Sequence, residues 1–199
     1  MSCSIFFKKQ ILRIAFDPFC TLKIWGYGLM KRSIMGTFYS TKTYGNDRGL
    51  SCCFRQWRST HSHCSLLHGY SIGVRLVFTC DTLDERNWVM DFGGLKPFKA
   101  WLEHMFDHTL LIAEDDPHLE LFKNLAAVGK IQSGNNSALC DLRIVPGVGC
   151  ELFAKMCYEK MNSILNESIQ SQNALNPTVK LKQVEVFEHG ANSAIYEAF

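Results

Sequence analysis

Three short stretches of the sequence hold most of the side chains that can take part in chemistry. They are residues 61–70, which carry three histidines and a cysteine, residues 106–108, and residues 185–190. Each stretch lies where a regular element is expected to begin or end, and binding and catalytic residues gather at such places. Thiols, imidazoles and carboxylates are the groups of nucleophilic attack, proton transfer and metal binding.

The first stretch places a thiol among imidazoles. On an extended segment, residues two apart point to the same side, so His61 and His63 share one face, as do His68 and Tyr70. Grouped imidazoles suit a zinc-sized ion, and a thiol beside such an ion, here Cys64, ionises readily. The same pattern also fits polar loop residues, because four metal ligands cannot be counted from this stretch alone.

The other two stretches supply carboxylates. Asp107 and His108 can form an orienting carboxylate and a proton-carrying imidazole. Adjacent residues on a helix do not face each other, so we expect each of them to meet a third group, such as Cys64. A histidine that stabilises a helix C-terminus is the alternative. Glu188 is either an exposed strand residue or a pocket carboxylate that accepts two hydrogen bonds from an amino-heterocycle such as a pterin or guanine.

The elements that position these groups follow from the apolar spacing. Alternating or short apolar runs predict strands over 50–57, 71–80, 141–145, 179–188 and 193–196. Helical spacing predicts helices over 94–106, 117–128 and 151–165. Loops are expected over 131–140 and 166–176. We expect the first two strands to pair in an antiparallel sheet with one face covered by a helix.

Composition and charge exclude several classes of protein. A chain of 199 residues with 47% hydrophobic and 20% charged residues fits one globular domain. No run approaches the ~20 apolar residues of a membrane span, so we expect no membrane partner. Residues 1–35 carry six cations and one acid, a net +5, whereas the whole chain carries +2, which leaves −3 for the rest. Nucleic acid is therefore not an expected partner. The phosphate-binding motifs GxxxxGK[ST] and GxGxxG are absent.

The cysteines and the N-terminus indicate a compartment and a domain start. Nine cysteines, an odd number without CxxC spacing, do not fit a disulfide framework, so the cytoplasm is expected. Asp17 and Lys23 interrupt the apolar runs that a signal peptide needs. We treat residues 1–35 as a basic N-terminal extension to a domain over 36–199; an ordered extra element or a targeting arm are the alternatives.

The order of these pieces resembles the 6-pyruvoyltetrahydropterin synthase / 6-carboxytetrahydropterin synthase family over 36–199. The motifs that carry the resemblance are Cys64-x3-His68-Gly69-Tyr70-Ser71, WVMDFGGLK at 88–96, FDHTLL at 106–111, VEVFE at 184–188 and AIY at 194–196. It implies an α+β tunnelling fold, an antiparallel sheet in the order strand-strand-helix-helix-strand-strand with helices on one face. It also implies homo-oligomeric rings with active sites at subunit interfaces.

The resemblance also implies roles for single residues. Cys64 matches the catalytic thiol, which removes a proton from the substrate side chain, and Asp107 and His108 match the acid–base pair. Glu188 matches the carboxylate that holds the pterin ring. Glu151 matches the glutamate of a Thr-x-Glu stretch that binds substrate, although the threonine is missing.

The family's zinc site is only partly matched. Three histidines hold zinc there, whereas this chain has His68 at one position, Tyr70 at the second and Phe54 at the third. The candidate replacement ligands are His63, ranked first because it lies beside Cys64, and then His61, Cys53 and His189. Without zinc, His63 or Arg58 would have to supply the electrostatic help.

These matches imply a lyase that converts 7,8-dihydroneopterin triphosphate to 6-carboxytetrahydropterin, acetaldehyde and triphosphate, as in queuosine and deazapurine synthesis. A 6-pyruvoyltetrahydropterin-forming enzyme is the alternative within the family. The alternative of a different class is a non-catalytic pterin-binding subunit without metal, favoured by Tyr70 and Phe54. The presence of Cys64 together with Glu188 and the acid–base pair favours an enzyme.

Overall fold

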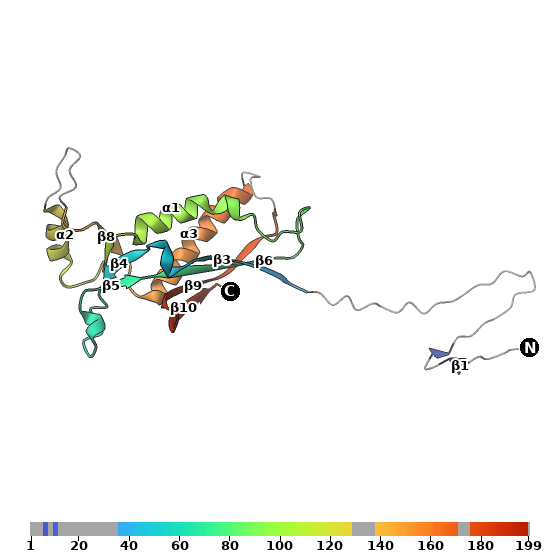
Figure 1. Cartoon of the computed structure of the whole chain (residues 1–199), viewed down its shortest axis with the longest axis horizontal. Coiled ribbons are helices and arrows are strands. Elements are labelled where there is room, and N and C mark those ends of the chain that lie inside the picture. Colours follow the sequence, from blue (N-terminus) through green and yellow to red (C-terminus); the bar gives the residue numbers. More distant parts are fainter. Residues whose placement is uncertain (1–5, 8–9, 12–35, 129–137, 171–175, 199) are drawn as a thin grey trace, which may run out of the picture. The chain divides into compact units, whose positions relative to one another are not determined.

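The computed structural model describes residues 6–7, 10–11, 36–128, 138–170 and 176–198. Contacts within the chain define two units, 1–36 and 37–199. In the first unit, strand β1 (Phe6–Phe7) pairs antiparallel with β2 (Gln10–Ile11). All elements predicted from the sequence lie in the second unit (Figure 1).

The first sheet of the second unit is antiparallel throughout, with the strand order β10-β9-β6-β3. Its strands are β3 (Phe38–Tyr44), β6 (Gly73–Cys80), β9 (Lys180–His189) and β10 (Asn192–Glu197). The alternation predicted over 71–80 is confirmed, because every second side chain from Ile72 to Cys80 is buried. Strand β3 had no prediction, and it pairs with β6 at the edge of the sheet.

The second sheet has the strand order β5-β4-β7-β8 and mixes antiparallel and parallel pairs. Its strands are β4 (Ser51–Phe54), β5 (His68–Ser71), β7 (Thr109–Ala113) and β8 (Leu142–Val145). The prediction that 50–57 pairs with 71–80 is wrong, because β4 and β6 lie in different sheets. Only Ile72 separates β5 from β6, so the chain from 68 to 80 serves both sheets, and β4 pairs with its first part.

Two helices, α1 (Lys96–Phe106) and α3 (Cys150–Gln170), cover one face of the first sheet (Figure 1). A further helix is α2 (Leu119–Ala127), and the 3-10 turns are η1 (Asn46–Arg48), η2 (His63–Ser65) and η3 (Phe92–Leu95). Helix α3 packs on β9 and β10, whereas α2 packs on β7 and β8. None of the described helices is long and apolar enough to cross a membrane.

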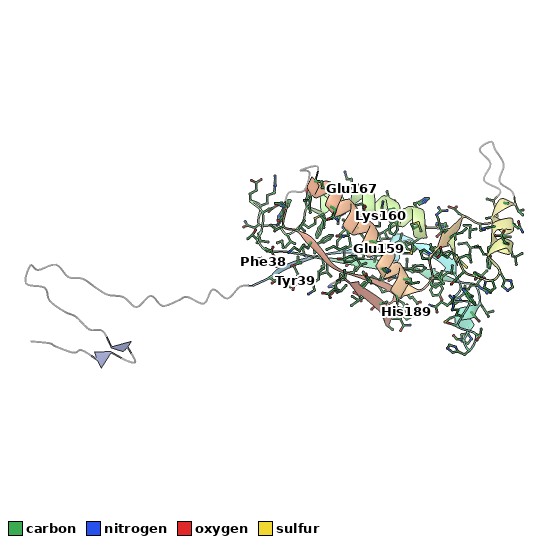
Figure 2. All side chains as sticks on the ribbon, turned by 180° about the vertical axis from the view of Figure 1, so that it is seen from behind. Phe38, Tyr39, Glu159, Lys160, Glu167 and His189 are labelled. Atoms are coloured by element: carbon green, nitrogen blue, oxygen red, sulfur yellow. The ribbon has the colours of Figure 1, made fainter. Side chains whose placement is uncertain are left out.

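Helix α3 is longer than its apolar pattern predicted. The loop expected over 166–176 is wrong for 166–170, which continue the helix, and 171–175 lie outside the described residues. The apolar face does not end at Leu165, because Ile169 also packs against the core. Figure 2 shows Glu159 and Glu167 along α3, where both are exposed and form its polar side. Most of the loop expected over 131–140 also lies outside the described residues.

Aromatic rings join the two sheets and the helices in one core. Phe153 of α3 contacts the Phe54 ring at 5.1 Å and the Phe106 ring at 5.2 Å between centroids, both edge to face. All three side chains are fully buried. Edge-to-face aromatic contacts of this kind add ~1 kcal/mol each to the burial of apolar area. Phe54 therefore anchors the end of β4 in the core, next to the stretch that carries the candidate site.

A bulge decides which way the end of β9 faces. The pairing of β6 with β9 shifts between Val77 and Phe78, so the strict alternation predicted over 179–188 is wrong. Leu181 is buried before the shift, and Val184 and Val186 are buried after it. Because side chains two apart share a face, Glu188 extends the buried row of Val184 and Val186.

Candidate active site

Three ring side chains converge at the β4–β5 pair. In its register Phe54 lies opposite His68, and Tyr70 is two residues further along β5, so all three share one face. The Phe54 and Tyr70 rings are stacked at 3.8 Å with an interplanar angle of 8°. The His68 ring lies 4.5 Å from that of Tyr70. His68 donates from Nδ1 to the Leu66 carbonyl at 2.8 Å, because a carbonyl oxygen can only accept.

Cys64 lies in η2, on a loop that is tied back to β4. The Ser62 hydroxyl accepts a hydrogen bond from the Cys64 amide at 3.2 Å, and the Cys64 carbonyl accepts one from the Gln56 amide at 2.7 Å. At the base of the loop, Arg55 pairs with the buried carboxylate of Asp116 at 2.9 Å. The half-buried thiol is therefore held on a backbone fixed at both ends.

Tyr70 shows which groups gather beside the rings. Burial, with smaller contributions from Glu188, Cys64, Cys150 and Cys52, raises the pKa of Tyr70 to about 12. Each of these groups is thus close enough to act on the charge of the phenol. The structure brings together Cys64 and Glu188, two residues singled out from the sequence, around a tyrosine.

The first turn of α3 completes this group. The Cys150 thiol donates a hydrogen bond to the Glu188 carboxylate, and burial, followed by the charges of Glu188 and Glu151, raises the pKa of Cys150 to about 12. Gly149, at the position of the family's missing threonine, has a φ of 117°. This backbone conformation favours glycine, and a Cβ there would also require the end of the Gln56 side chain to move, because its Nε2 would lie 2.5 Å away.

Asn46 fixes the end of β9 against the end of β5. Its side-chain amide donates to the backbone carbonyl of Glu188 at 3.0 Å and to that of Ser71. The Ser71 hydroxyl in turn donates to the Asn46 carbonyl at 3.0 Å. This single side chain connects the strand that carries Glu188 with the strand that carries Tyr70.

Asp107 and His108 form a separate pair on the surface. His108 Nδ1 lies 2.5 Å from Asp107 Oδ1, and the His108 side chain is 86% exposed. The prediction that adjacent residues cannot meet is wrong here, because α1 ends at Phe106. Asp107 is extended and His108 has a φ of 56°, which turns its ring toward the carboxylate. Within the described residues, no hydrogen bond or ion pair links the two side chains to Cys64 or Glu188.

The residues suggested as replacement metal ligands are dispersed. His63 is exposed, and His189, at the end of β9 in Figure 2, accepts a hydrogen bond from the Ala191 amide within the β9–β10 turn. Arg58, suggested as a substitute charge, pairs with Asp115 at 2.6 Å.

The donor set does not fit a zinc ion. In the part of the chain that the structure describes, no group of three or more His, Cys, Asp or Glu side chains is placed to hold a metal. A catalytic zinc needs about three protein ligands, and here His68 has a phenylalanine and a tyrosine as its neighbours.

Two residues of this site had no role in the sequence analysis. Cys150 directly precedes the substrate-binding candidate Glu151, and Asn46 lies before the first predicted strand, so neither was a candidate. No spacing rule links either residue to Glu188, since the contacts span 38 and 142 positions. The one available signal was the asparagine after Gly45, because asparagine side chains often bond to nearby backbone groups at turns.

Comparison with known proteins identifies the family. The family model described as 6-pyruvoyl tetrahydropterin synthase matches residues 46–198, and the chain belongs to this family. The match includes every residue of the site described above.

Individual relatives agree with the family at low identity. The 6-carboxy-5,6,7,8-tetrahydropterin synthase of Rickettsia conorii is 32% identical over 57 residues, 28% of this chain, and the chain spans 41% of that relative's length. The protein of the same name from Aquifex aeolicus is 28% identical over 137 residues, 67% of this chain and 75% of the relative. A solved 6-pyruvoyltetrahydropterin synthase from Plasmodium vivax superposes with a TM-score of 0.54 over 82% of this chain and 98% of its own, at 15% identity, which shows the fold alone.

Proposed function

We propose that this chain is a carbon–carbon lyase of the 6-carboxytetrahydropterin synthase type. It converts 7,8-dihydroneopterin triphosphate to 6-carboxytetrahydropterin, with release of acetaldehyde and triphosphate. The observation that carries the proposal is the position of Cys64 and Glu188 at the β4–β5 pair: the Cys64 loop is hydrogen-bonded to the chain after β4, and Asn46 holds Glu188 at the end of β5. A nucleophilic thiol and a ring-binding carboxylate thus belong to one site around Tyr70. The names of the curated relatives support the 6-carboxy product over the 6-pyruvoyl product.

Each group has a distinct task in this proposal. Glu188 accepts hydrogen bonds from the amino and ring N–H groups of the pterin, and Glu151 adds a second carboxylate at the start of α3. The Cys64 thiolate removes a proton from a carbon of the substrate side chain. The exposed His108, oriented by Asp107, exchanges protons with the side-chain oxygens.

The assembly proposed for this chain is a homo-oligomeric ring. Strands β3 and β10 are the two edges of the first sheet, and each offers one row of backbone groups for pairing with another chain. The pair of Asp107 and His108 is exposed and unconnected to Cys64 within the described part of one chain. We therefore propose that active sites lie at subunit boundaries, where an acid–base pair from one chain reaches the thiol of another.

One observation favours a second candidate function. The stack of Phe54 on Tyr70 occupies two positions at which the resemblance to the family implies zinc ligands. A chain that had lost turnover together with its metal would be a pterin-binding subunit, in which Glu188 still holds the ring. The two candidates differ in turnover and not in binding.

The deciding experiment measures turnover of 7,8-dihydroneopterin triphosphate by mass spectrometry, with the purified full chain and its Cys64→Ala variant. We expect 6-carboxytetrahydropterin from the unmodified protein and a loss of at least ~100-fold in kcat for the variant, with pterin affinity unchanged. Cys53→Ala is the matched control, because Cys53 packs against Leu110 and Ile112 on the other side of β4. Binding without turnover in the unmodified protein would favour the pterin-binding subunit.

A further inference from the structure

The zinc position of the family is built over by side chains in this chain. Phe54 is fully buried, stacks on Tyr70 at 3.8 Å and meets the ring of Phe153 edge to face at 5.1 Å. A ring held on both sides in this way belongs to the core and cannot move aside for an ion without leaving a cavity. His68 is the one histidine at the three positions, and because its Nδ1 donates to the Leu66 carbonyl, it offers one ligand atom, Nε2, where a catalytic zinc needs about three ligands.

The three positions nevertheless converge on one point. The rings of Phe54 and His68 lie 3.8 Å and 4.5 Å from the ring of Tyr70, on one face of the β4–β5 pair. The three positions therefore lie side by side, and this chain carries aromatic rings without a metal-ligating nitrogen at two of them. Among these three side chains, Tyr70 is the one that has a hydroxyl group.

The hydroxyl of Tyr70 is available to a ligand. Tyr70 is half-buried, and no hydrogen bond among the described residues uses its hydroxyl group. Stacking on Phe54 fixes the ring and hence the direction of the O–H bond. A tyrosine with a buried ring and a free O–H group usually places that group against a polar partner. The Asn46 side chain holds the backbone of Glu188 beside Ser71, the residue after Tyr70, so a substrate held by Glu188 would reach this hydroxyl.

We infer that this chain holds its substrate without a metal ion, with the Tyr70 hydroxyl donating a hydrogen bond to a side-chain oxygen of the pterin substrate at the position where relatives have zinc. The identity of that substrate rests on the proposed function, whereas the absence of a zinc site does not. Tyr70 is thus a further binding residue, and Phe54 positions it.

The first test measures zinc content, independently of activity. The full chain is incubated with zinc chloride, dialysed and analysed by inductively coupled plasma mass spectrometry. We expect less than ~0.1 zinc per chain for the unmodified protein and about one for F54H/Y70H, which restores three imidazoles. Adding His68→Ala to the double variant should remove the ion again.

Two outcomes would overturn the metal-free site. The first is about one zinc per unmodified chain that is lost in His68→Ala. The second is failure of the histidine variants to gain zinc, which would contradict the convergence of the three positions. If F54H/Y70H does not fold, judged by circular dichroism, Y70H alone retains the buried Phe54 and should bind zinc at least ~10-fold more tightly than the unmodified chain.

The second test removes the hydroxyl and keeps the ring. Tyr70→Phe should weaken binding of 7,8-dihydroneopterin triphosphate by about 10-fold in a fluorescence titration. Tyr158→Phe is the matched control, because its hydroxyl donates to the Leu181 carbonyl at 3.2 Å, and its affinity should not change. Unchanged affinity of Tyr70→Phe would overturn the role of the hydroxyl. If the unmodified protein binds this compound without turnover, the proposed function fails while the inference on Tyr70 stands.

Discussion

The candidate site consists of two parts that are built differently. The inner part consists of Tyr70, Cys64 and Glu188, which are half-buried, and the buried Cys150, so it joins residues from two strands, a loop and a helix. The outer part is the pair of Asp107 and His108, neighbours in sequence, with a histidine side chain that is 86% exposed.

This difference separates positions that support the fold from positions that serve chemistry alone. Inner residues hold elements together as well as facing the substrate, because Glu188 bonds to the first residue of α3. The outer pair is held by one backbone bend and by the His108 amide, which donates to the Ser51 carbonyl at 2.7 Å. Substitution of Glu188 in the inner part should therefore change stability and binding together, whereas substitutions in the outer part should change turnover alone.

Apart from the Cys64→Ala variant described above, the largest effect is expected from the outer pair. His108→Gln should lower kcat by about 100-fold, since one positioned acid–base group contributes about that much. Because the side chain is exposed, the free energy of unfolding should change by less than ~0.5 kcal/mol. Turnover assays and urea denaturation of the same variant measure both quantities. His118→Gln, an exposed histidine before α2, is the control for turnover. A loss of stability above ~2 kcal/mol would show that the pair is structural.

A smaller effect on binding is expected at Glu188. Glu188→Gln removes the charge that the pterin N–H groups would meet, so affinity should fall by about 10-fold, or ~1.4 kcal/mol. It also weakens the hydrogen bond from Cys150, which should cost up to ~1 kcal/mol of stability. Fluorescence titration and urea denaturation provide the two values. Glu185→Gln is the control, because Glu185 lies on the opposite face and pairs with Arg75 at 3.9 Å. Full affinity of Glu188→Gln would show that the pterin ring binds elsewhere.

The smallest effect is a pH dependence of stability that comes from buried thiols, of which Cys150 belongs to the inner part and Cys52 and Cys157 do not. Burial raises the pKa of Cys52 and of Cys150 from 9.0 to about 12. Between pH 9 and 12 the unfolded chain binds fewer protons than the folded one, so stability is complete below pH 9 and falls as pH rises. The loss should be about 1 kcal/mol for each thiol at pH 10, measured by urea denaturation from pH 8 to 10.

Two variants test how much of this loss of stability comes from Cys150 of the inner part. Cys150→Ala should flatten the decrease in stability above pH 9, whereas His108→Gln should leave its slope unchanged. Equal slopes for Cys150→Ala and the unmodified protein would show that this thiol is as accessible to water in the folded chain as in the unfolded one.

Patterns within one element were predictable from the sequence. The buried row from Ile72 to Cys80 and the positions of α1 and α3 follow from periods of 2 and 3.6 residues. Strand β7 is buried along its whole length and has no alternation, so no periodic signal indicated it. Strand β3 has a mostly polar sequence at a sheet edge, where burial imposes little on side-chain choice.

The pairing of the elements was not predictable from these periods. Strand β4 joined β5 instead of β6, because the chain changes sheets at Ile72, and no local rule indicates such a change. The bulge in β9 likewise depends on the partner strand. Periodicity describes one element at a time, whereas register and sheet order depend on pairs of elements.

The sequence by itself determined the family motifs, the order of Cys64, Asp107, His108 and Glu188, and the loss of two histidines. Only the tertiary structure decided what the replacements do, since stacking of Phe54 on Tyr70 requires the register of β4 with β5. It also brought Cys150 and Asn46 to Glu188 across 38 and 142 positions. The physical reason is that residue types set which contacts are favourable, whereas the packing of the whole chain sets which of them can form together.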